Sequence, residues 1–345
     1  MTSMGFIGRV AALTGLAIAV AGAAAAQQVT WKYHHFSSPR GWDGKVMVGR
    51  VVDEIERVSK GRIGIKVFPG MQLGGKPSGL INQVVDGVVD IVYALPGYTP
   101  GRFPQLAGLE LPFLGAPSSV VATKVAWDYF DAYAHVEFKG FRPLDIHLTD
   151  VGQLHTTKKK ITKVGDLAGL KIRVASRYIG VTVKALGGVP VHMPLPAVYE
   201  ALARGQVQGM MIPWLIMKPF KLHDVTKYHL DIPMFQSVIL QVMSEKSYQK
   251  LPADLRAAID HATRRKTSDW IAIQQDKVGA ESLAYGLKRG ADVTNLSKAE
   301  MAPWVNRAKS AHDLWVKELN QKGFNGAERL AFLKKSIAKY EKMTK

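Results

Sequence analysis

Apolar and polar positions alternate in blocks between residues 166 and 214, and the rest of the chain is organised around this stretch. Short β-branched runs such as GLKIRV predict strands, and the segments between them follow a helical spacing and end at glycine. Five elements are expected in succession: a strand at 169–174, a helix at 178–186, a strand at 189–193, a helix at 197–204 and a strand at 206–212. This alternation predicts an α/β fold with a parallel sheet covered on both faces.

Arg173 is the first candidate functional residue, because it lies at the carboxyl end of the strand at 169–174. Ligands of open α/β sheets bind in the crevice beyond the carboxyl ends of the strands. A guanidinium group there stays charged and offers a planar pair of donors that matches a carboxylate. The alternative is an arginine at the rim of the sheet that extends into solvent. Position alone leaves both interpretations open.

The same patterns predict elements along the remaining chain. Strands are expected at 29–36, 62–68, 88–94, 142–148, 154–161 and 235–243, and helices at 43–60, 76–86, 120–133, 254–287, 298–322 and 326–342. The strand at 154–161 is expected at a sheet edge, and the helix at 254–287 is expected to be continuous and long enough to brace two lobes. The loop YTPGRFP puts Tyr98 near the crevice, although turn chemistry alone also explains its prolines and glycine.

One sequence pattern that occurs twice is consistent with two similar lobes. INQVVDGVVDIVY (81–93) and ALARGQVQGMMI (201–212) both have the pattern of a helix, a glycine (Gly87 or Gly205) and an apolar strand. Two α/β lobes built alike would produce such a pair, and chance would produce it too. The length of 345 residues fits about two domains.

The first 26 residues have the pattern of a secretory signal peptide. Arg9 precedes an apolar run at 10–22, and alanines at 24–26 fit the small-x-small cleavage rule before Gln27. The run is shorter than the ~20 residues of a membrane-spanning helix. A cleaved signal and a periplasmic location are therefore expected, with an uncleaved N-terminal anchor as the alternative.

Composition narrows the function further. The chain has no cysteine, which excludes disulfides, thiolate metal sites and a cysteine nucleophile. Its formal net charge of +18 favours acidic partners, but the lysines are dispersed, so an acidic solute is expected and nucleic acid is not. The sequence contains no GxSxG, no HExxH and no phosphate-binding glycine-lysine loop. Neither an enzyme nor a bound cofactor is expected.

An ordered set of motifs resembles the substrate-binding proteins of tripartite ATP-independent periplasmic (TRAP) transporters. The matching features are KGRI with IKVFP and QLGG, then DGVVDIVYA, ELPF, DLAGLKIRV, LGGVPVHMPLPAVYEALARGQVQG and LPADLRAAI before a long helix. The resemblance implies a two-lobed periplasmic-binding-protein fold with mixed, mainly parallel sheets and a long helix that spans both lobes. It also implies a solute cleft between the lobes and delivery to one small and one large integral membrane subunit.

The resemblance also suggests how the chain divides. Residues 1–26 form the signal peptide. Residues 27–150 with 239–280 form the first lobe, and residues 151–238 with 281–345 form the second.

The family's carboxylate-binding arginine falls on Arg173, and three positions depart from the family pattern. Gln208 replaces an acidic residue, Gln153 replaces a second arginine, and Ile212 replaces the asparagine of sugar-acid binders. By the same matching, the cleft is lined around Arg173 and Gln153 by Phe36, Leu95, Tyr98, Ser176, Leu195, Ile212 and Trp214.

These expected cleft residues predict the class of solute. A sugar acid would leave its hydroxyl groups unpaired at a cost of ~1–3 kcal/mol each, and a dicarboxylate would need a second cation. The best match is a monocarboxylate with an apolar or aromatic body that stacks on Trp214, Phe36 or Tyr98. Because only the closed lobes contact both ends of such a ligand, binding is expected to favour closure.

Two alternatives to a TRAP transporter component stay open. A periplasmic solute sensor for an organic acid needs only the same binding and closure. A binding protein of another transporter type would have similar lobes, although the continuous helix from Asp254 favours the TRAP type.

Overall fold

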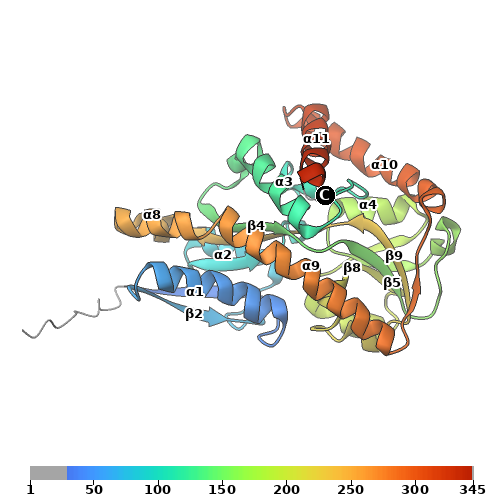
Figure 1. Cartoon of the computed structure of the whole chain (residues 1–345), viewed down its shortest axis with the longest axis horizontal. Coiled ribbons are helices and arrows are strands. Elements are labelled where there is room, and N and C mark those ends of the chain that lie inside the picture. The colour runs from blue at the N-terminus through green and yellow to red at the C-terminus, as the bar shows by residue number, and fades with distance from the viewer. Residues whose placement is uncertain (1–28, 344–345) are drawn as a thin grey trace, which may run out of the picture.

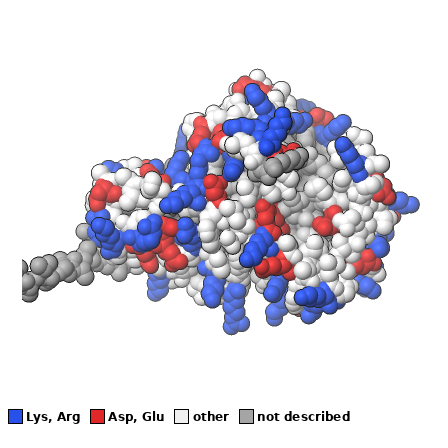
Figure 2. All heavy atoms as spheres, in the orientation of Figure 1, with Lys and Arg blue, Asp and Glu red and all other residues white. Residues whose placement is uncertain are grey.

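The computed structural model describes residues 29–343, which form two α/β lobes, each built on its own sheet (Figure 1). The predicted signal peptide lies outside the described residues. Within residues 29–343, no helix is both long enough and apolar enough to cross a membrane. Acidic and basic side chains are interspersed on the face shown in Figure 2, in keeping with the dispersed lysines of the sequence.

The first sheet has five strands in the order β2-β1-β3-β10-β4. They are β1 (Val29–His35), β2 (Ile63–Phe68), β3 (Ile91–Ala94), β4 (Phe141–Leu148) and β10 (Val238–Ser244). β1 is parallel to β2 and β3, whereas β10 is antiparallel to β3 and β4. The sheet is covered by α1 (Val48–Val58), α2 (Leu80–Asp86) and α3 (Ser119–Ala132), and a π-helical turn at Asp43–Met47 leads into α1.

The second sheet has six strands in the order β11-β9-β5-β8-β6-β7. The predicted alternation at 169–212 is confirmed as β6 (Lys171–Val174), α4 (Arg177–Ala185), β7 (Val189–His192), α5 (Val198–Ala203) and β8 (Gly209–Pro213). β6 is parallel to both β7 and β8. The remaining strands are β5 (Gly152–Thr156), β9 (Tyr228–Phe235) and β11 (Asp292–Thr294).

The strand predicted at the sheet edge lies in the interior of the second sheet. β5 pairs antiparallel with β8 on one side and with β9 on the other. The strand expected at 235–243 is confirmed as β10, which begins at Val238 in the first sheet, while Phe235 ends β9 in the second sheet. The pattern missed β9 because its neighbours, which satisfy its backbone groups, are remote in sequence.

The helix expected to be continuous at 254–287 is broken into α8 (Ala253–Ala262) and α9 (Arg265–Lys288). Thr263 is extended, and Arg264 has a φ of 59°. At the break the N–H of Arg264 donates to the carbonyl of Leu144 in β4 at 2.5 Å, and the hydroxyl of Thr263 donates to the carbonyl of Ile259 at 2.8 Å. The bond to β4 is a tertiary contact, so helical periodicity alone could not predict the break.

Helix α9 crosses both lobes, as predicted for the long helix. It packs against α3 and β4 of the first lobe and against α6 (Trp214–Met217) of the second (Figure 1). Gly279 allows a close approach, because a Cβ atom there would lie 2.2 Å from the Oδ2 atom of Asp150. Outside this layer, α10 (Lys298–Gln321) packs on α4, and α11 (Gly326–Met343) packs on α3.

Two connections cross side by side between the sheets, one joining β4 to β5 and the other joining β9 to β10. The N–H of Thr149 donates to the carbonyl of Ser237 at 3.0 Å, and the N–H of Ser237 donates to the Thr149 hydroxyl at 3.1 Å. The two connections are therefore hydrogen-bonded to each other, next to the cavity described below. The lobe boundaries proposed from the sequence stay a prediction.

Candidate ligand-binding site

A cavity lies between the two lobes, at the carboxyl ends of β1, β3 and β4 in one sheet and of β6 and β8 in the other. The space there that protein atoms do not fill is about 510 Å³, part of it open to solvent. This is the crevice where α/β sheets bind ligands, because the turns that leave parallel strands meet there. Of the nine residues expected to line it, six do so: Phe36, Leu95, Tyr98, Arg173, Leu195 and Ile212.

Arg173 is buried in the wall of this cavity, with 2% of its surface exposed. Its Nε donates to the carbonyl of Met193 at 3.0 Å and its Nη1 to the carbonyl of Met211 at 3.4 Å. Among residues 29–343, no carboxylate forms an ion pair with it. Burial lowers the pKa of Arg173, which expresses the cost of removing an unpaired cation from water. An anion in the cavity would offset that cost.

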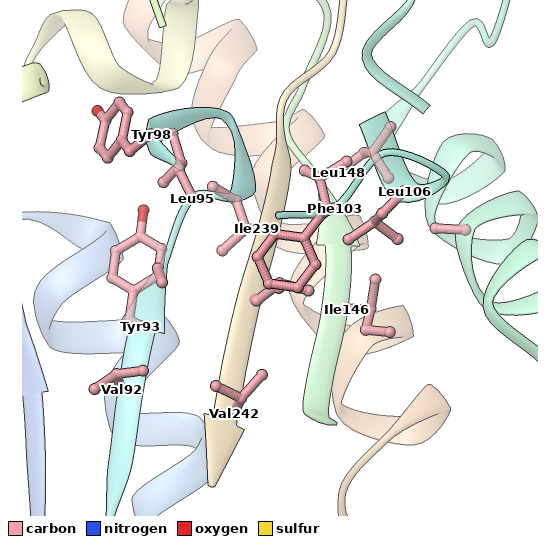
Figure 3. Packing of buried hydrophobic residues seen from close by; sticks show 14 of the residues in the cluster. Val92, Tyr93, Leu95, Tyr98, Phe103, Leu106, Ile146, Leu148, Ile239 and Val242 are labelled. Atoms are coloured by element: carbon pink, nitrogen blue, oxygen red, sulfur yellow. The ribbon is translucent and has the colours of Figure 1, made fainter. Parts of the chain in front are cut away.

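Tyr98 connects the two lobes across the cavity. Its hydroxyl oxygen accepts a hydrogen bond from the N–H of Leu195 at 2.9 Å and lies 3.5 Å from Nη2 of Arg173. Burial raises the pKa of Tyr98, and the Arg173 charge opposes that rise. Figure 3 shows Tyr93 on β3 with its hydroxyl directed toward the carboxyl end of the strand, where Tyr98 follows. This arrangement places an aromatic group from the first lobe beside the guanidinium of the second.

The wall beside Arg173 is aromatic and aliphatic. The ring of Phe36 stacks on Tyr93 with centroids 4.9 Å apart, and it meets Tyr98 edge-on at 5.7 Å. Leu95, Leu195 and other aliphatic side chains complete this surface. Such a wall favours a flat or branched apolar group over one that carries several hydroxyls.

Three of the expected residues do not line this cavity. The indole Nε1 of Trp214 donates to Asp231 at 3.1 Å, and its ring packs 4.8 Å from that of His155. Ser176 borders a separate surface cleft. Gln153 pairs with Ile212 across β5 and β8, and so shares the same face of the sheet without reaching the cavity. Trp214 is displaced because it begins α6, where strand alternation no longer sets the direction of a side chain.

Sequence reasoning missed five polar residues that line the cavity: Asp43, His147, Thr149, Ser237 and Gln275. A signal that could have identified His147 is its spacing from Asp145, because residues i and i+2 of a strand lie on the same face and can pair. No comparable signal marked Asp43 or Gln275, because the turn before α1 and the middle of α9 reach the cavity only through tertiary packing. Burial raises the pKa of Asp43, which favours its neutral, protonated form.

Asp145 holds the ring of His147 in place. The Oδ2 atom of Asp145 lies 2.6 Å from Nδ1 of His147 and accepts from Gln241 at 2.9 Å, while Oδ1 accepts from Ser268 at 2.5 Å. These four side chains come from β4, β10 and α9, so two strands and the long helix fix one imidazole. The other ring nitrogen, Nε2, is buried without a partner among the described residues, as is Nε2 of Gln275.

Two α/β lobes with a cavity between them, lined by a buried guanidinium that pairs with no carboxylate of residues 29–343, are typical of a solute-binding protein. The family model of bacterial extracellular solute-binding protein family 7 matches residues 47–318, and the chain belongs to this family. Its relatives are periplasmic solute-binding components of TRAP transporters, which bind solutes rather than catalyse reactions. The resemblance noted from the sequence motifs is thereby confirmed, although the continuous helix that favoured it is not.

Solved structures and a curated relative place the chain within this family. A TRAP solute-binding protein of Rhodoferax ferrireducens, solved with copurified benzoate, superposes with a TM-score of 0.88 at 33% identity, over 92% of this chain and 99% of that one. One from an unidentified marine microbe, solved with 3-hydroxybenzoate, gives 0.87 at 33%, over 91% and 99%. The ectoine/5-hydroxyectoine-binding periplasmic protein of Ruegeria pomeroyi is 25% identical, over 95% of this chain and 96% of that protein.

Proposed function

We propose that this chain captures an aromatic monocarboxylate in the periplasm and delivers it to the small and large membrane subunits of a TRAP transporter. The observation that supports this most strongly is Arg173, a buried guanidinium without a carboxylate partner in the described chain, set in an aromatic and aliphatic cavity. One negative charge satisfies it, and a ring fits the wall of Phe36 and Tyr98.

The relatives support the same class of solute. The two structures at 33% identity were solved with benzoate and 3-hydroxybenzoate, which are aromatic acids with one carboxylate. Neither ligand requires the second cation that a dicarboxylate would need. Ile212, which lines the cavity where sugar-acid binders carry asparagine, argues against a polyhydroxylated acid.

The proposed mechanism is closure around the ligand. The carboxylate binds Arg173 on the second lobe, and the ring contacts Phe36 and Tyr98 of the first. Only the closed form offers both sets of contacts, so the ligand shifts the population toward closure. The closed form is then the one that the membrane subunits recognise.

Calorimetry on the mature chain tests the proposal with benzoate, hydroxybenzoates, phenylacetate, succinate and glucuronate. Aromatic monocarboxylates should bind, and Arg173→Ala should weaken them at least about 30-fold, because truncating one partner of a buried charge pair costs ~2–5 kcal/mol. Arg173→Lys should restore part of the affinity, since lysine lacks the planar fork.

Arg177→Ala is the matched control. Arg177 is near in sequence, but it pairs with Glu318 at the surface and does not line the cavity. It should leave affinity unchanged. Full affinity in Arg173→Ala, or a selective response to glucuronate, would contradict the proposal.

A further inference from the structure

The cavity contains polar atoms that binding a carboxylate at Arg173 does not use. His147 lies at the end of β4 and Gln275 lies in α9, and both line the same cavity as Arg173. Arg173 belongs to β6 of the second sheet, whereas β4 belongs to the first. His147 and Arg173 therefore line the cavity from different sheets, and Gln275 lines it from the long helix.

Both groups are buried and incompletely paired. His147 has 0% of its surface exposed and Gln275 has 1%, and the Nε2 atom of each has no hydrogen-bond partner within residues 29–343. Buried polar atoms are nearly always hydrogen-bonded, because leaving them unpaired forfeits their interaction with water. With Oδ1 and Oδ2 of Asp43, four such atoms line this one cavity, and they indicate ligand groups that pair with them.

The surroundings of His147 decide what that group is. Asp145 accepts from Gln241 and Ser268, so it is an acceptor toward the imidazole as well, and the N–H of Nδ1 donates to it. Nε2 of a neutral ring held in this way is an acceptor. In that tautomer it pairs with a donor from the ligand, which an ionised carboxylate cannot provide. Gln275 adds a donor through Nε2.

We propose that His147 and Gln275 form a hydroxyl-recognition site, so that the preferred solute is an aromatic monocarboxylate with a ring hydroxyl. The hydroxyl donates to Nε2 of His147 and accepts from Nε2 of Gln275, while the carboxylate binds Arg173. A hydroxyl is the group that donates and accepts at one atom, which is what this pair of partners requires. The inference rests on the proposed function, since it assumes that the carboxylate is bound at Arg173.

Two substitutions remove the site with little change in shape. His147→Asn keeps an N–H near the position of Nδ1, so the bond to Asp145 is retained while Nε2 is lost. Gln275→Met keeps the length of the side chain and removes its amide. His261→Asn, in α8 and outside the cavity lining, is the matched control. Thermal unfolding of each variant identifies any that fails to fold.

The experiment measures affinity for benzoate, for 2-, 3- and 4-hydroxybenzoate and for the matching methoxybenzoates. In the unchanged chain, one hydroxybenzoate should bind at least about tenfold tighter than benzoate, and its methyl ether should lose that advantage. His147→Asn and Gln275→Met should each reduce this advantage, the ratio of hydroxybenzoate affinity to benzoate affinity, at least about threefold. His261→Asn should leave the ratio unchanged.

The outcomes separate this inference from the proposed function. If benzoate and all hydroxybenzoates fail to bind, both the proposed function and this inference are refuted. If benzoate binds and no hydroxybenzoate binds more tightly, the hydroxyl site is refuted and the proposed function stands. An advantage that survives both substitutions would assign hydroxyl recognition to other groups and would equally refute this site.

Discussion

The hydroxyl of Tyr98 accepts a 2.9 Å hydrogen bond from the N–H of Leu195, so a side chain of the first lobe is bonded to the backbone of the second. Tyr98 follows β3, and Leu195 precedes α5. Under the proposed mechanism the bond forms on closure, because its two atoms belong to different lobes. It therefore couples the aromatic wall of the cavity to closure.

Tyr98→Phe should weaken the binding of aromatic acids about tenfold, because the N–H of Leu195 loses its acceptor in the closed form. Calorimetry with benzoate measures the affinity, and small-angle X-ray scattering measures the closed fraction. Tyr248→Phe is the control, since its hydroxyl bonds to Asp260 on the outer side of the first lobe. Equal affinities in the two variants would show that the Tyr98 hydroxyl does not contribute to closure.

Trp214→Phe should lower stability without changing affinity. The substitution removes the bond to Asp231 and part of the packing on His155, at an expected cost of ~1–3 kcal/mol in the free energy of unfolding. Affinity for benzoate should stay within about twofold, because Trp214 does not line the cavity. Phe36→Leu alters the cavity wall itself, so it should lower the affinity for benzoate more than it lowers the free energy of unfolding. A large loss of affinity in Trp214→Phe would support the stacking role expected from the sequence.

Glu110 should make the chain less stable as the pH rises from 4.5 to 7. Burial raises the pKa of Glu110 from 4.5 to about 7. Between these values the folded state keeps the proton that the unfolded state releases, so the free energy of unfolding falls with rising pH, by up to about 3 kcal/mol.

Glu110→Gln tests this linkage. The amide oxygen of glutamine can still accept from the N–H of Val238, which lies 2.9 Å from Oε1 of Glu110. Urea unfolding at pH 4.5 and pH 7.5 should show a smaller decrease for the variant than for the unchanged chain. Glu137, whose pKa burial also raises to about 7, remains in both proteins, so only the difference between them is informative. If the free energy of unfolding falls equally in both proteins, Glu110 does not contribute to the pH dependence of stability.

Gly108→Ala should destabilise the packing of α10 on the first lobe. A Cβ atom at Gly108 would lie 2.3 Å from the ring of Trp315, whose Nε1 donates to the carbonyl of Pro104 at 2.8 Å. Such overpacking costs ~1–3 kcal/mol, which is measurable as a lower thermal unfolding midpoint. Gly49→Ala in α1 is the matched control. No heavy atom lies within 4 Å of its added Cβ, and it should stabilise by ~0.5–1 kcal/mol.

Local sequence determined much of the fold. The strands and helices at 169–212 follow from their apolar spacing and from the glycines between them. The paired helix-glycine-strand segments end as predicted, with Gly87 at a φ of 78° and Gly205 at a φ of 69°. These left-handed turns favour glycine for local steric reasons, so they are visible in sequence. Arg173 was identifiable too, since its place at a strand end and the family motif agree.

Only the tertiary structure decided the features that depend on contacts between remote segments. The break at Thr263 arises because the N–H of Arg264 bonds to Leu144 in β4, and β9 was recognised only through its neighbours. His147 and Gln275 reach the cavity from a strand and a helix far apart in sequence. Hydrophobic periodicity reports which face of an element is buried, but not which element covers it. That is why the sequence indicated the guanidinium of the site, and only folding revealed the other polar residues that line it.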